Sequence, residues 1–214
     1  MINIEITNTD VYNFNNAIRG MRNALQSWDK SDSKMHFDDL DLDQWDWEFV
    51  IGDNDLELAL KLCKAGSDHR KFLRQIFVSV DISSPWYWFK EYATYKIGTV
   101  ENSTSMMHCL TNRLLTKDDF EWDGYTYWRS LTLEHLNDLI EIYNQSEDKE
   151  EKNAVWRELI QDMPGSFIYT RTCSLNYEVL RNMYHSRKNH KLVEWHQFCE
   201  WIEELPYSEL ITVK

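Results

Sequence analysis

The sequence predicts an α+β fold: one domain spanning residues 1–214, with helices packed on a mixed or antiparallel sheet. Three observations support this class. Residues 75–82 alternate apolar and polar side chains, the period of two that is typical of a half-buried strand. Several other segments repeat apolar residues at helical spacing. No internal repeat or domain-sized linker interrupts the chain, and a hydrophobic content of 43% is ample for one packed core.

Capping and helix-breaking residues delimit the elements of the N-terminal third. Ile2–Ile6 alternates as a strand does, and Thr9 or Asp10 is a suitable N-cap for a following helix. Residues 27–50 are polar and rich in Asp, which indicates an exposed, irregular flap or excursion. The expected elements are a strand at 2–6, a helix from 9 or 10 to 21, the flap at 27–50 with a short strand at 45–51, and a helix at 56–65 that ends at Gly66.

The remaining elements follow the strand at 75–82. Ser83 and Ser84 offer small polar caps, and Pro85 suits the first position of a helix. Pro164 and Gly165 break the chain before another strand. The expected elements are a helix at 85–95, a polar turn at 99–105 with a short helix after it, an irregular segment at 117–130, helices at 133–143 and 152–161, a strand at 167–175, and helices at 177–187 and 192–204.

Composition narrows the function classes. A formal net charge of −13 argues against binding nucleic acid or an anionic membrane through bulk charge. The four cysteines form no C-x-x-C pair and are expected to be reduced and mostly buried. The chain starts without a charged and then apolar leader, and it has no apolar run of about 18 residues. We therefore expect a cytoplasmic protein without a membrane span.

Cations gather near the end of this acidic chain. The five are Arg171, Arg181, Arg187, Lys188 and Lys191. A cationic cluster in an anionic protein is typical of a site for a small anion, and Arg binds phosphate or carboxylate with two parallel hydrogen bonds. The alternative from the residues alone is a basic helix face in contact with solvent.

Two further groups are ambiguous by themselves. The polar run at 99–105 follows Gly98 and precedes a short helix, an arrangement that either binds phosphate through backbone N–H groups or only caps a connection. The group of His and Cys residues at 185–199 lacks a recognised ligand motif, so no metal site is predicted there. Nucleophile-elbow, P-loop and dinucleotide-binding signatures are also missing from the sequence.

The order of these segments resembles that of the flavin-dependent thymidylate synthases, the ThyX family. The resemblance covers about residues 66–108 and 163–211, where the closing block matches best. The matching positions are Gly66 and His69 before a strand, Thr94-Tyr95-Lys96 after a helix, and then Met163-Pro164, Thr170, Leu175-Asn176, Leu180, Arg187, His190, Glu194 and Leu205-Pro206.

The chain departs from the family signature R-H-R-x-x-S-x-N-E-x-S-x-R-Y. In the register set by Lys96, the first Arg and the His become Thr94 and Tyr95, and the later Arg becomes Met106. A register shifted by one residue aligns Asn102 and Ser105 but loses the match at Lys96. Neither register restores the cationic cluster of the signature.

The resemblance implies a homotetramer that binds FAD and dUMP, with methylenetetrahydrofolate as the carbon donor. It assigns roles residue by residue. The assigned residues are Asn102 and Ser105 as catalytic, His69, Tyr95, Lys96, Thr99 and His190 as cofactor-binding, and Glu91, Thr104, Asn176, Arg187 and Glu194 as substrate-binding.

Three functions remain open at this point. The first is a ThyX-like nucleotide-binding protein that acts as a flavin-dependent transferase and methylates or modifies a pyrimidine deoxynucleotide such as dUMP. The second is a non-catalytic relative, phage-encoded or regulatory, that sequesters or senses a nucleotide. The third is an interaction module, in which the aromatic segment Trp86–Phe89 contacts a partner protein.

Overall fold

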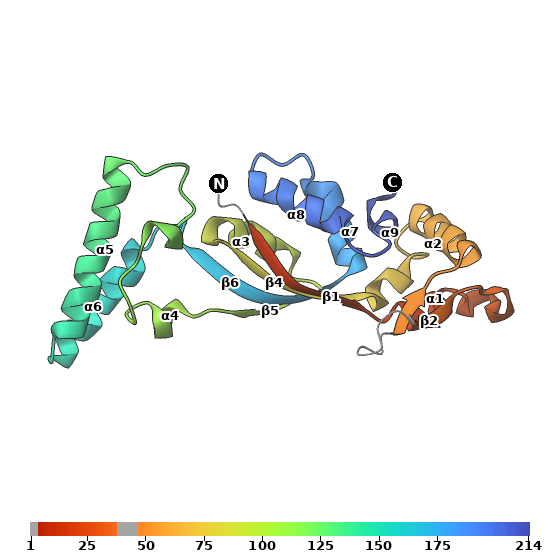
Figure 1. The fold of residues 1–214 in the computed structure, drawn as a ribbon, viewed down its shortest axis with the longest axis horizontal. Helices are drawn as coiled ribbons and strands as arrows, with labels where there is room; N and C mark the ends of the chain where they lie inside the picture. Colours follow the sequence, from red (N-terminus) through yellow and green to blue (C-terminus); the bar gives the residue numbers. More distant parts are fainter. Residues whose placement is uncertain (1–3, 38–46) are drawn as a thin grey trace. The chain divides into compact units, whose positions relative to one another are not determined.

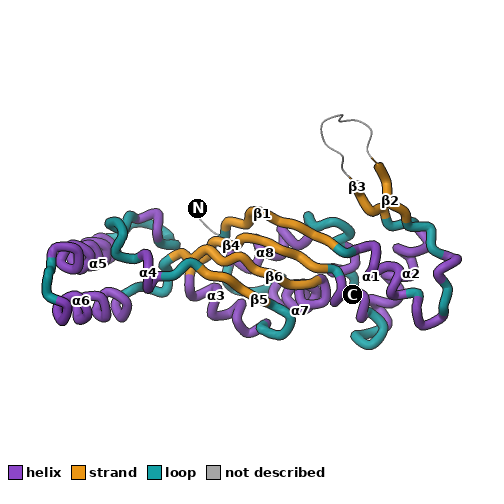
Figure 2. Tube along the Cα trace, turned by 90° about the horizontal axis from the view of Figure 1, so that it is seen from below, coloured by secondary structure: helices purple, strands orange, loops and turns teal. Residues whose placement is uncertain are grey.

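The computed structural model describes residues 4–37 and 47–214. The main sheet has four strands in the order β1-β4-β6-β5, and a second sheet pairs β2 with β3 in antiparallel fashion (Figures 1 and 2). The predicted α+β class with a mixed or antiparallel sheet is confirmed. The strands are β1 (Glu5–Tyr12), β2 (Lys34–Phe37), β3 (Trp47–Val50), β4 (Phe77–Pro85), β5 (Val100–Ser103) and β6 (Ile168–Asn176).

Strands β4 and β6 run antiparallel, as side-chain contacts between them show. The Ser83 and Thr170 hydroxyl oxygens lie 2.7 Å apart, and the Thr172 hydroxyl donates to Asp81 at 2.5 Å. Residue numbers therefore fall along β4 as they rise along β6. The alternation predicted for β4 is present, because Val78, Val80 and Ile82 are fully buried.

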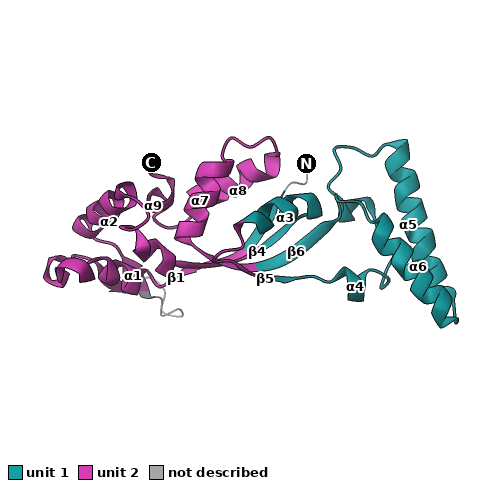
Figure 3. Ribbon diagram, turned by 180° about the vertical axis from the view of Figure 1, so that it is seen from behind, with its two compact units in different colours: residues 1–7, 81–94, 101–172 teal, residues 8–80, 95–100, 173–214 magenta. Residues whose placement is uncertain are grey.

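The chain divides into two compact units (Figure 3). Unit 1 comprises residues 1–7, 81–94 and 101–172, and unit 2 comprises residues 8–80, 95–100 and 173–214. The division passes through β1, β4 and β6, each of which has residues in both units.

Unit 1 contains a helical hairpin, α5 packed on α6 (Figure 2). Its core includes Phe120, Leu136, Ile140 and Leu159, all at most 1% exposed. The Thr126 hydroxyl accepts a hydrogen bond from the backbone N–H of Arg129 and so caps α5. The helices of this unit are α3 (Trp86–Tyr92), α4 (Met106–Cys109), the 3-10 helix η5 (Lys117–Asp119), α5 (Tyr127–Gln145) and α6 (Lys149–Asp162).

Unit 2 packs its helices around α7, which contacts α8 and α9. The fully buried ring of Tyr177 meets Phe14 edge-on at a centroid distance of 5.6 Å. The α-helices of this unit are α1 (Phe14–Met21), α2 (Asp53–Ala65), α7 (Tyr177–Arg187), α8 (Val193–Glu203) and α9 (Glu209–Thr212). Its 3-10 helices are η1 (Asn23–Leu25), η2 (Trp28–Lys30) and η3 (Lys71–Gln75). A further 3-10 helix, η4 (Ala93–Tyr95), has residues in both units.

The prediction of a helix from residue 9 or 10 is wrong, because β1 continues to Tyr12 and α1 begins at Phe14. Asn13 separates them with a φ of 75°, a left-handed conformation that Asn tolerates better than most residues. As an edge strand, β1 needs little apolar sequence, and its residues are mostly exposed. The polar residues after Ile6 therefore concealed the extension of the predicted strand to Tyr12.

The irregular segment predicted at 117–130 is also wrong at both ends. It begins with η5, which a capping box between Thr116 and Asp119 closes, and it ends with the first turn of α5. The predicted flap at 27–50 falls partly outside the described residues. Its described part contains η2, β2 and β3, and β3 confirms the short strand expected at 45–51. Among the described residues, each helix is too short or too polar to cross a membrane.

Candidate functional site

The guanidinium of Arg187 lies next to two aromatic rings in unit 2. Arg187 is the last residue of α7, and its Nε donates a hydrogen bond to the Tyr95 hydroxyl at 2.8 Å. The guanidinium carbon lies 5.4 Å from the centroid of the Tyr95 ring and 4.9 Å from that of Trp195. Trp195, from α8, is fully buried and meets Tyr95 edge-on at 6.1 Å. These contacts hold the half-buried cation in one place.

The Gly98 turn lies against the start of the same helix. Gly98 has a φ of +86°, and a Cβ built on it would lie 3.1 Å from Val179 and 3.4 Å from the Asn176 amide nitrogen. A larger residue would therefore be strained and crowded there. The Thr99 hydroxyl donates to the carbonyl of Tyr95 at 3.3 Å, which folds the turn back toward η4. The Gly98 turn thus connects the segment of Tyr95 and Thr99 to Asn176 at the start of α7.

Asn176 is the N-cap of α7. Its side-chain oxygen accepts a hydrogen bond from the Val179 N–H at 3.1 Å and caps α7. His190 Nδ1 likewise accepts from the Leu192 N–H at 3.2 Å, and its ring lies 6.3 Å from that of Trp195. His190 thus packs near the tryptophan that contacts Arg187, and the ligand contacts assigned to Asn176 and His190 stay predictions.

The other predicted residues of unit 2 are distributed more widely. Glu194 is buried in the first turn of α8 at 6% exposure, whereas Lys96 and His69 are exposed. His69 follows the Gly66 turn, and its neighbour Arg70 donates to the Glu178 carboxylate at 2.9 Å. Glu194 precedes Trp195 in the sequence and Lys96 follows Tyr95, so both adjoin residues that contact Arg187. His69 belongs to the turn after α2.

The cationic cluster that the sequence indicates is smaller in the structure. Arg171 pairs with Glu101, and its guanidinium carbon lies 4.1 Å from the centroid of the Phe89 ring. Arg181 is buried and donates to the Ile211 carbonyl. Arg171 neutralises the charge of Glu101, and Arg181 binds the backbone at Ile211. A cation removed from water needs such a polar partner. The expectation that all five form one cationic face is therefore wrong.

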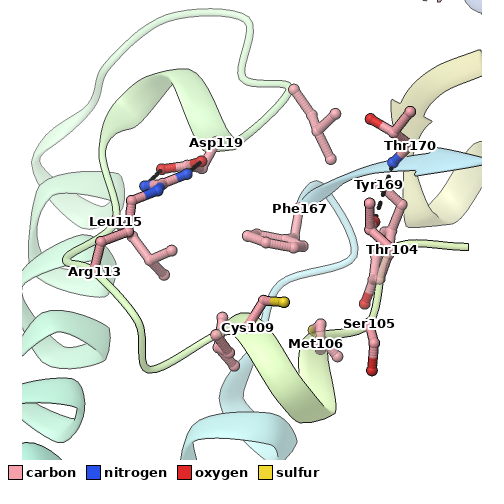
Figure 4. A pocket seen from close by; sticks show the side chains of 12 residues that line it. Thr104, Ser105, Met106, Cys109, Arg113, Leu115, Asp119, Phe167, Tyr169 and Thr170 are labelled. Atoms are coloured by element: carbon pink, nitrogen blue, oxygen red, sulfur yellow. Dashed lines mark hydrogen bonds and ion pairs between the residues drawn. The ribbon is translucent and has the colours of Figure 1, made fainter.

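Unit 1 holds a cavity of about 220 Å³ beside the end of β5 (Figure 4). Two predicted site residues, Thr104 and Ser105, line it. The Thr104 N–H donates to the Thr170 carbonyl at 2.9 Å, and the Thr170 N–H donates back to the Thr104 hydroxyl at 3.3 Å. The other lining residues are Met106, Cys109, Leu110, Arg113, Leu115, Asp119, Phe167, Ile168, Tyr169 and Thr170.

Charge at this cavity is balanced by an ion pair. Arg113 and Asp119 face each other with two parallel hydrogen bonds, one of them 2.8 Å between Nη1 and Oδ2 (Figure 4). Burial raises the pKa of Tyr169, so its hydroxyl stays protonated and available as a donor at neutral pH. The cavity thus offers hydroxyl groups and an apolar wall, which suits a small polar ligand more than a free anion.

Of the two residues predicted to be catalytic, Ser105 lines the cavity and Asn102 does not. Asn102 lies exposed on β5. Glu91, predicted to bind substrate, is half-buried in α3, where its carbonyl accepts from the Thr94 hydroxyl at 2.8 Å. The roles assigned to Asn102, Glu91 and Ser105 stay predictions.

Some residues of these two regions were missed by the sequence interpretation. Trp195 contacts Arg187, and Arg113, Asp119 and Tyr169 line the cavity. One signal was readable: the spacing Thr116-x-x-Asp119 is that of a capping box. The tryptophan followed Glu194 in a predicted helix, but its contact depends on how α7 and α8 pack.

Comparisons with known proteins give the fold. No protein-family model matches the sequence, and no curated protein matches it either. Solved structures do match over nearly the whole chain. A structure of thymidylate synthase X (ThyX) from Helicobacter pylori with FAD and dUMP has a TM-score of 0.71 at 15% identity, covering 99% of this chain and 97% of that chain.

A second structure of the Helicobacter pylori flavin-dependent ThyX, complexed with FAD and dUMP, has a TM-score of 0.70 at 16% identity and covers 100% of this chain and 98% of that chain. A UMP/dUMP methylase, PolB from Streptomyces cacaoi bound with 5-Br dUMP, has a TM-score of 0.55 at 11% identity, covering 97% and 93%. The predicted resemblance is confirmed at the level of the fold: the chain has the fold of these ThyX structures.

Proposed function

We propose that this chain, which has the ThyX fold, binds a pyrimidine nucleotide such as dUMP, and that Arg187 is its phosphate-binding residue. The observation that carries the proposal is the position of the Arg187 guanidinium, which donates to the Tyr95 hydroxyl at 2.8 Å and lies 4.9 Å from the centroid of the Trp195 ring. A guanidinium presents parallel N–H donors in a fixed fork that matches phosphate oxygens, and Arg187 donates its Nε to Tyr95.

Electrostatics supports an anionic ligand at this position. The chain has a formal charge of −13 and would repel anions over most of its surface. A half-buried guanidinium stacked on rings binds phosphate more strongly than an exposed lysine does, because water screens it less. The two aromatic rings restrict its rotamers, so less side-chain entropy is lost when a ligand binds.

The ligand class rests on the similar structures. Two of them contain dUMP and one contains 5-Br dUMP, and each likeness covers at least 97% of this chain. Within unit 1, the cavity at Thr104 and Ser105 is a separate candidate for binding a small polar ligand, because its hydroxyl groups suit the polar edge of a base or sugar. We also retain the homotetramer that the resemblance implies, which a solution mass near four chains would support.

Flavin catalysis is the alternative within this proposal, and the signature positions do not fit it well. Thr94 donates its hydroxyl to the Glu91 carbonyl, and Tyr95 accepts from Arg187. Lys96 is exposed and is the one cation among the three positions. A diphosphate group such as that of FAD favours a cluster of cations. A non-catalytic nucleotide-binding protein is therefore the favoured form.

A ligand-dependent melt tests nucleotide binding. Full-length protein is melted with dUMP, UMP, dTMP or inorganic phosphate at matched ionic strength, and affinities are then measured by calorimetry. We expect a rise in Tm with pyrimidine nucleotides, since a ligand specific for the native state stabilises it. Arg187→Ala should weaken binding by about 10- to 150-fold, the equivalent of about 1.5–3 kcal/mol for a charged hydrogen bond.

Matched variants make this result specific. Arg187→Lys keeps the charge but loses the planar fork, so its affinity should fall between those of the wild type and Arg187→Ala. Lys191→Ala removes an exposed cation four positions along the chain and should leave affinity unchanged. Equal binding by wild type and Arg187→Ala, with both folded, would refute the role of Arg187. The absorbance spectrum after saturation with FAD separates the two forms: flavin retained after gel filtration supports the enzyme.

A further inference from the structure

Three side chains of the α5–α6 hairpin converge on one point at the surface of unit 1. His135 comes from α5, and Glu158 and Asp162 come from α6. His135 Nε2 lies 2.8 Å from Asp162 Oδ2, and the one ligand atom that each of the three offers lies within 4.8 Å of the other two. Nothing in the proposed nucleotide function uses these residues.

The backbone beneath this cluster is well fixed. Glu158 and Asp162 are four residues apart, so they lie on the same face of α6, one turn from each other. Leu136, next to His135, and Leu159, next to Glu158, are both fully buried in the hairpin core. Packing of these leucines sets the spacing of the two helices, and only the exposed side chains need to move to change the ligand geometry.

We propose that His135, Glu158 and Asp162 bind a divalent transition-metal ion such as Zn²⁺. Zinc bonds to His nitrogen and carboxylate oxygen are about 2.0–2.2 Å long, so tetrahedral ligand atoms lie roughly 3.4 Å apart. The His135–Asp162 separation of 2.8 Å is shorter than that value and all three ligand atoms lie within 4.8 Å of one another, so rotamer changes of exposed side chains suffice to reach it. Three protein ligands leave a fourth position for water, as in open zinc sites.

The ligand set also selects the kind of ion. An imidazole nitrogen favours Zn²⁺ and its neighbours in the first transition row, whereas Mg²⁺ and Ca²⁺ prefer oxygen alone. Two carboxylates and a neutral imidazole match the charge of a divalent ion. The exposed His135–Asp162 contact stabilises little by itself. A bound ion would instead connect α5 to α6 through coordinate bonds.

Calorimetry with ZnCl₂ tests the site in the full-length protein after removal of metal by a chelator. We expect one Zn²⁺ per chain and a higher Tm with zinc than without it. His135→Ala and Asp162→Asn should each weaken binding by at least about tenfold, because even loss of a supporting partner weakens zinc sites about 10- to 100-fold. A large excess of Mg²⁺ should not displace the zinc.

Two control variants separate this site from adventitious binding. Glu134→Gln removes an exposed carboxylate next to His135 and should bind zinc as the wild type does. Cys109→Ser removes an exposed thiol, a side chain of a type that can also bind zinc, and one Zn²⁺ per chain should remain. The melting temperatures of the metal-free variants show that each is folded. Unchanged zinc affinity in His135→Ala, or displacement of zinc by Mg²⁺, would overturn the proposal.

Discussion

Nη1 of Arg181 lies 2.8 Å from the carbonyl oxygen of Ile211, in a guanidinium that is only 6% exposed. Burial, followed by the charge of Arg70, lowers the pKa of Arg181. Ile211 belongs to α9, which packs on α7. A residue that the sequence places among the ligand-binding cations therefore holds the C-terminal helix on its neighbour.

Replacing Arg181 by Met should destabilise the protein. Met fills a similar volume but leaves the carbonyl of Ile211 without the charged donor, which costs about 2 kcal/mol. We expect the midpoint of urea unfolding to fall without a change in slope. Lys191→Met, at an exposed position, is the control and should shift stability by less than about 0.5 kcal/mol. Equal midpoints for the two variants would contradict the anchoring role.

A second buried charge, Asp55, predicts a response to pH. Asp55 is fully buried and accepts hydrogen bonds from Arg22 Nε and from the hydroxyl groups of Ser31 and Ser33. Burial by itself raises the pKa of Asp55, but the hydrogen bonds from Ser31, Ser33 and Arg22 outweigh it and hold the pKa below its ordinary value of 3.8.

Because the pKa of Asp55 is lower in the folded state, its ionised form contributes stability that is present above pH 3.8 and is lost as the pH falls through the folded value. Asp55→Asn should cost about 3–5 kcal/mol at neutral pH, since it leaves the Arg22 charge without its partner. The stability of this variant should then fall less steeply in acid.

The measurement for Asp55 is urea unfolding at several pH values between neutral and strongly acidic. Asp118→Asn, at an exposed position, is the control and should follow the wild-type curve. If Asp55→Asn loses stability in acid as steeply as the wild type does, the network around Asp55 is not the source of the acid sensitivity.

The sequence predicted those elements that begin with a strong N-cap and continue with apolar residues at regular spacing. The prediction of a helix at 177–187 agrees with α7 at both ends, because Asn176 is a strong cap and buried apolar residues follow at helical spacing. The first turn of α5 was missed for the opposite reason. Tyr127 and Trp128 there are 71% and 74% exposed, so the apolar residues of this turn do not follow the buried face.

The candidate site could be predicted only in part. Arg187 and Tyr95 were each singled out from the sequence, but 92 positions separate them, and no spacing rule links residues so far apart. Their contact depends on how the Gly98 turn packs on α7. The burial of Arg171 and Arg181 was likewise unpredictable, because a row of cations in a sequence does not show which of them face the core.

The cysteines give a chemical test of burial and of the cavity. Burial raises the pKa values of Cys63 and Cys199 to about 11, and Cys173 is also buried. Cys109 is exposed and lines the Thr104–Ser105 cavity. Because the thiolate is the reactive form, iodoacetamide at about pH 8 should label one cysteine per native chain.

Mass spectrometry of peptides locates that label. We expect it on Cys109, with no labelling of native Cys109→Ser and four labels on the denatured wild-type chain. A saturating pyrimidine nucleotide should slow the reaction if it occupies the cavity. Rapid labelling of Cys63 in the native protein would show that unit 2 opens more readily than its packing indicates.

Tyr95→Phe tests whether the position of Arg187 matters for ligand binding. The substitution keeps the ring but removes the hydroxyl that accepts from Arg187 Nε at 2.8 Å. A neutral acceptor of this kind contributes about 1 kcal/mol, so we expect nucleotide affinity to fall about fivefold while the melting temperature changes little. Tyr125→Phe, at a tyrosine that is 54% exposed, should bind as the wild type does. Calorimetry that finds equal affinity for Tyr95→Phe and Tyr125→Phe would mean that the guanidinium binds the nucleotide without support from the Tyr95 hydroxyl.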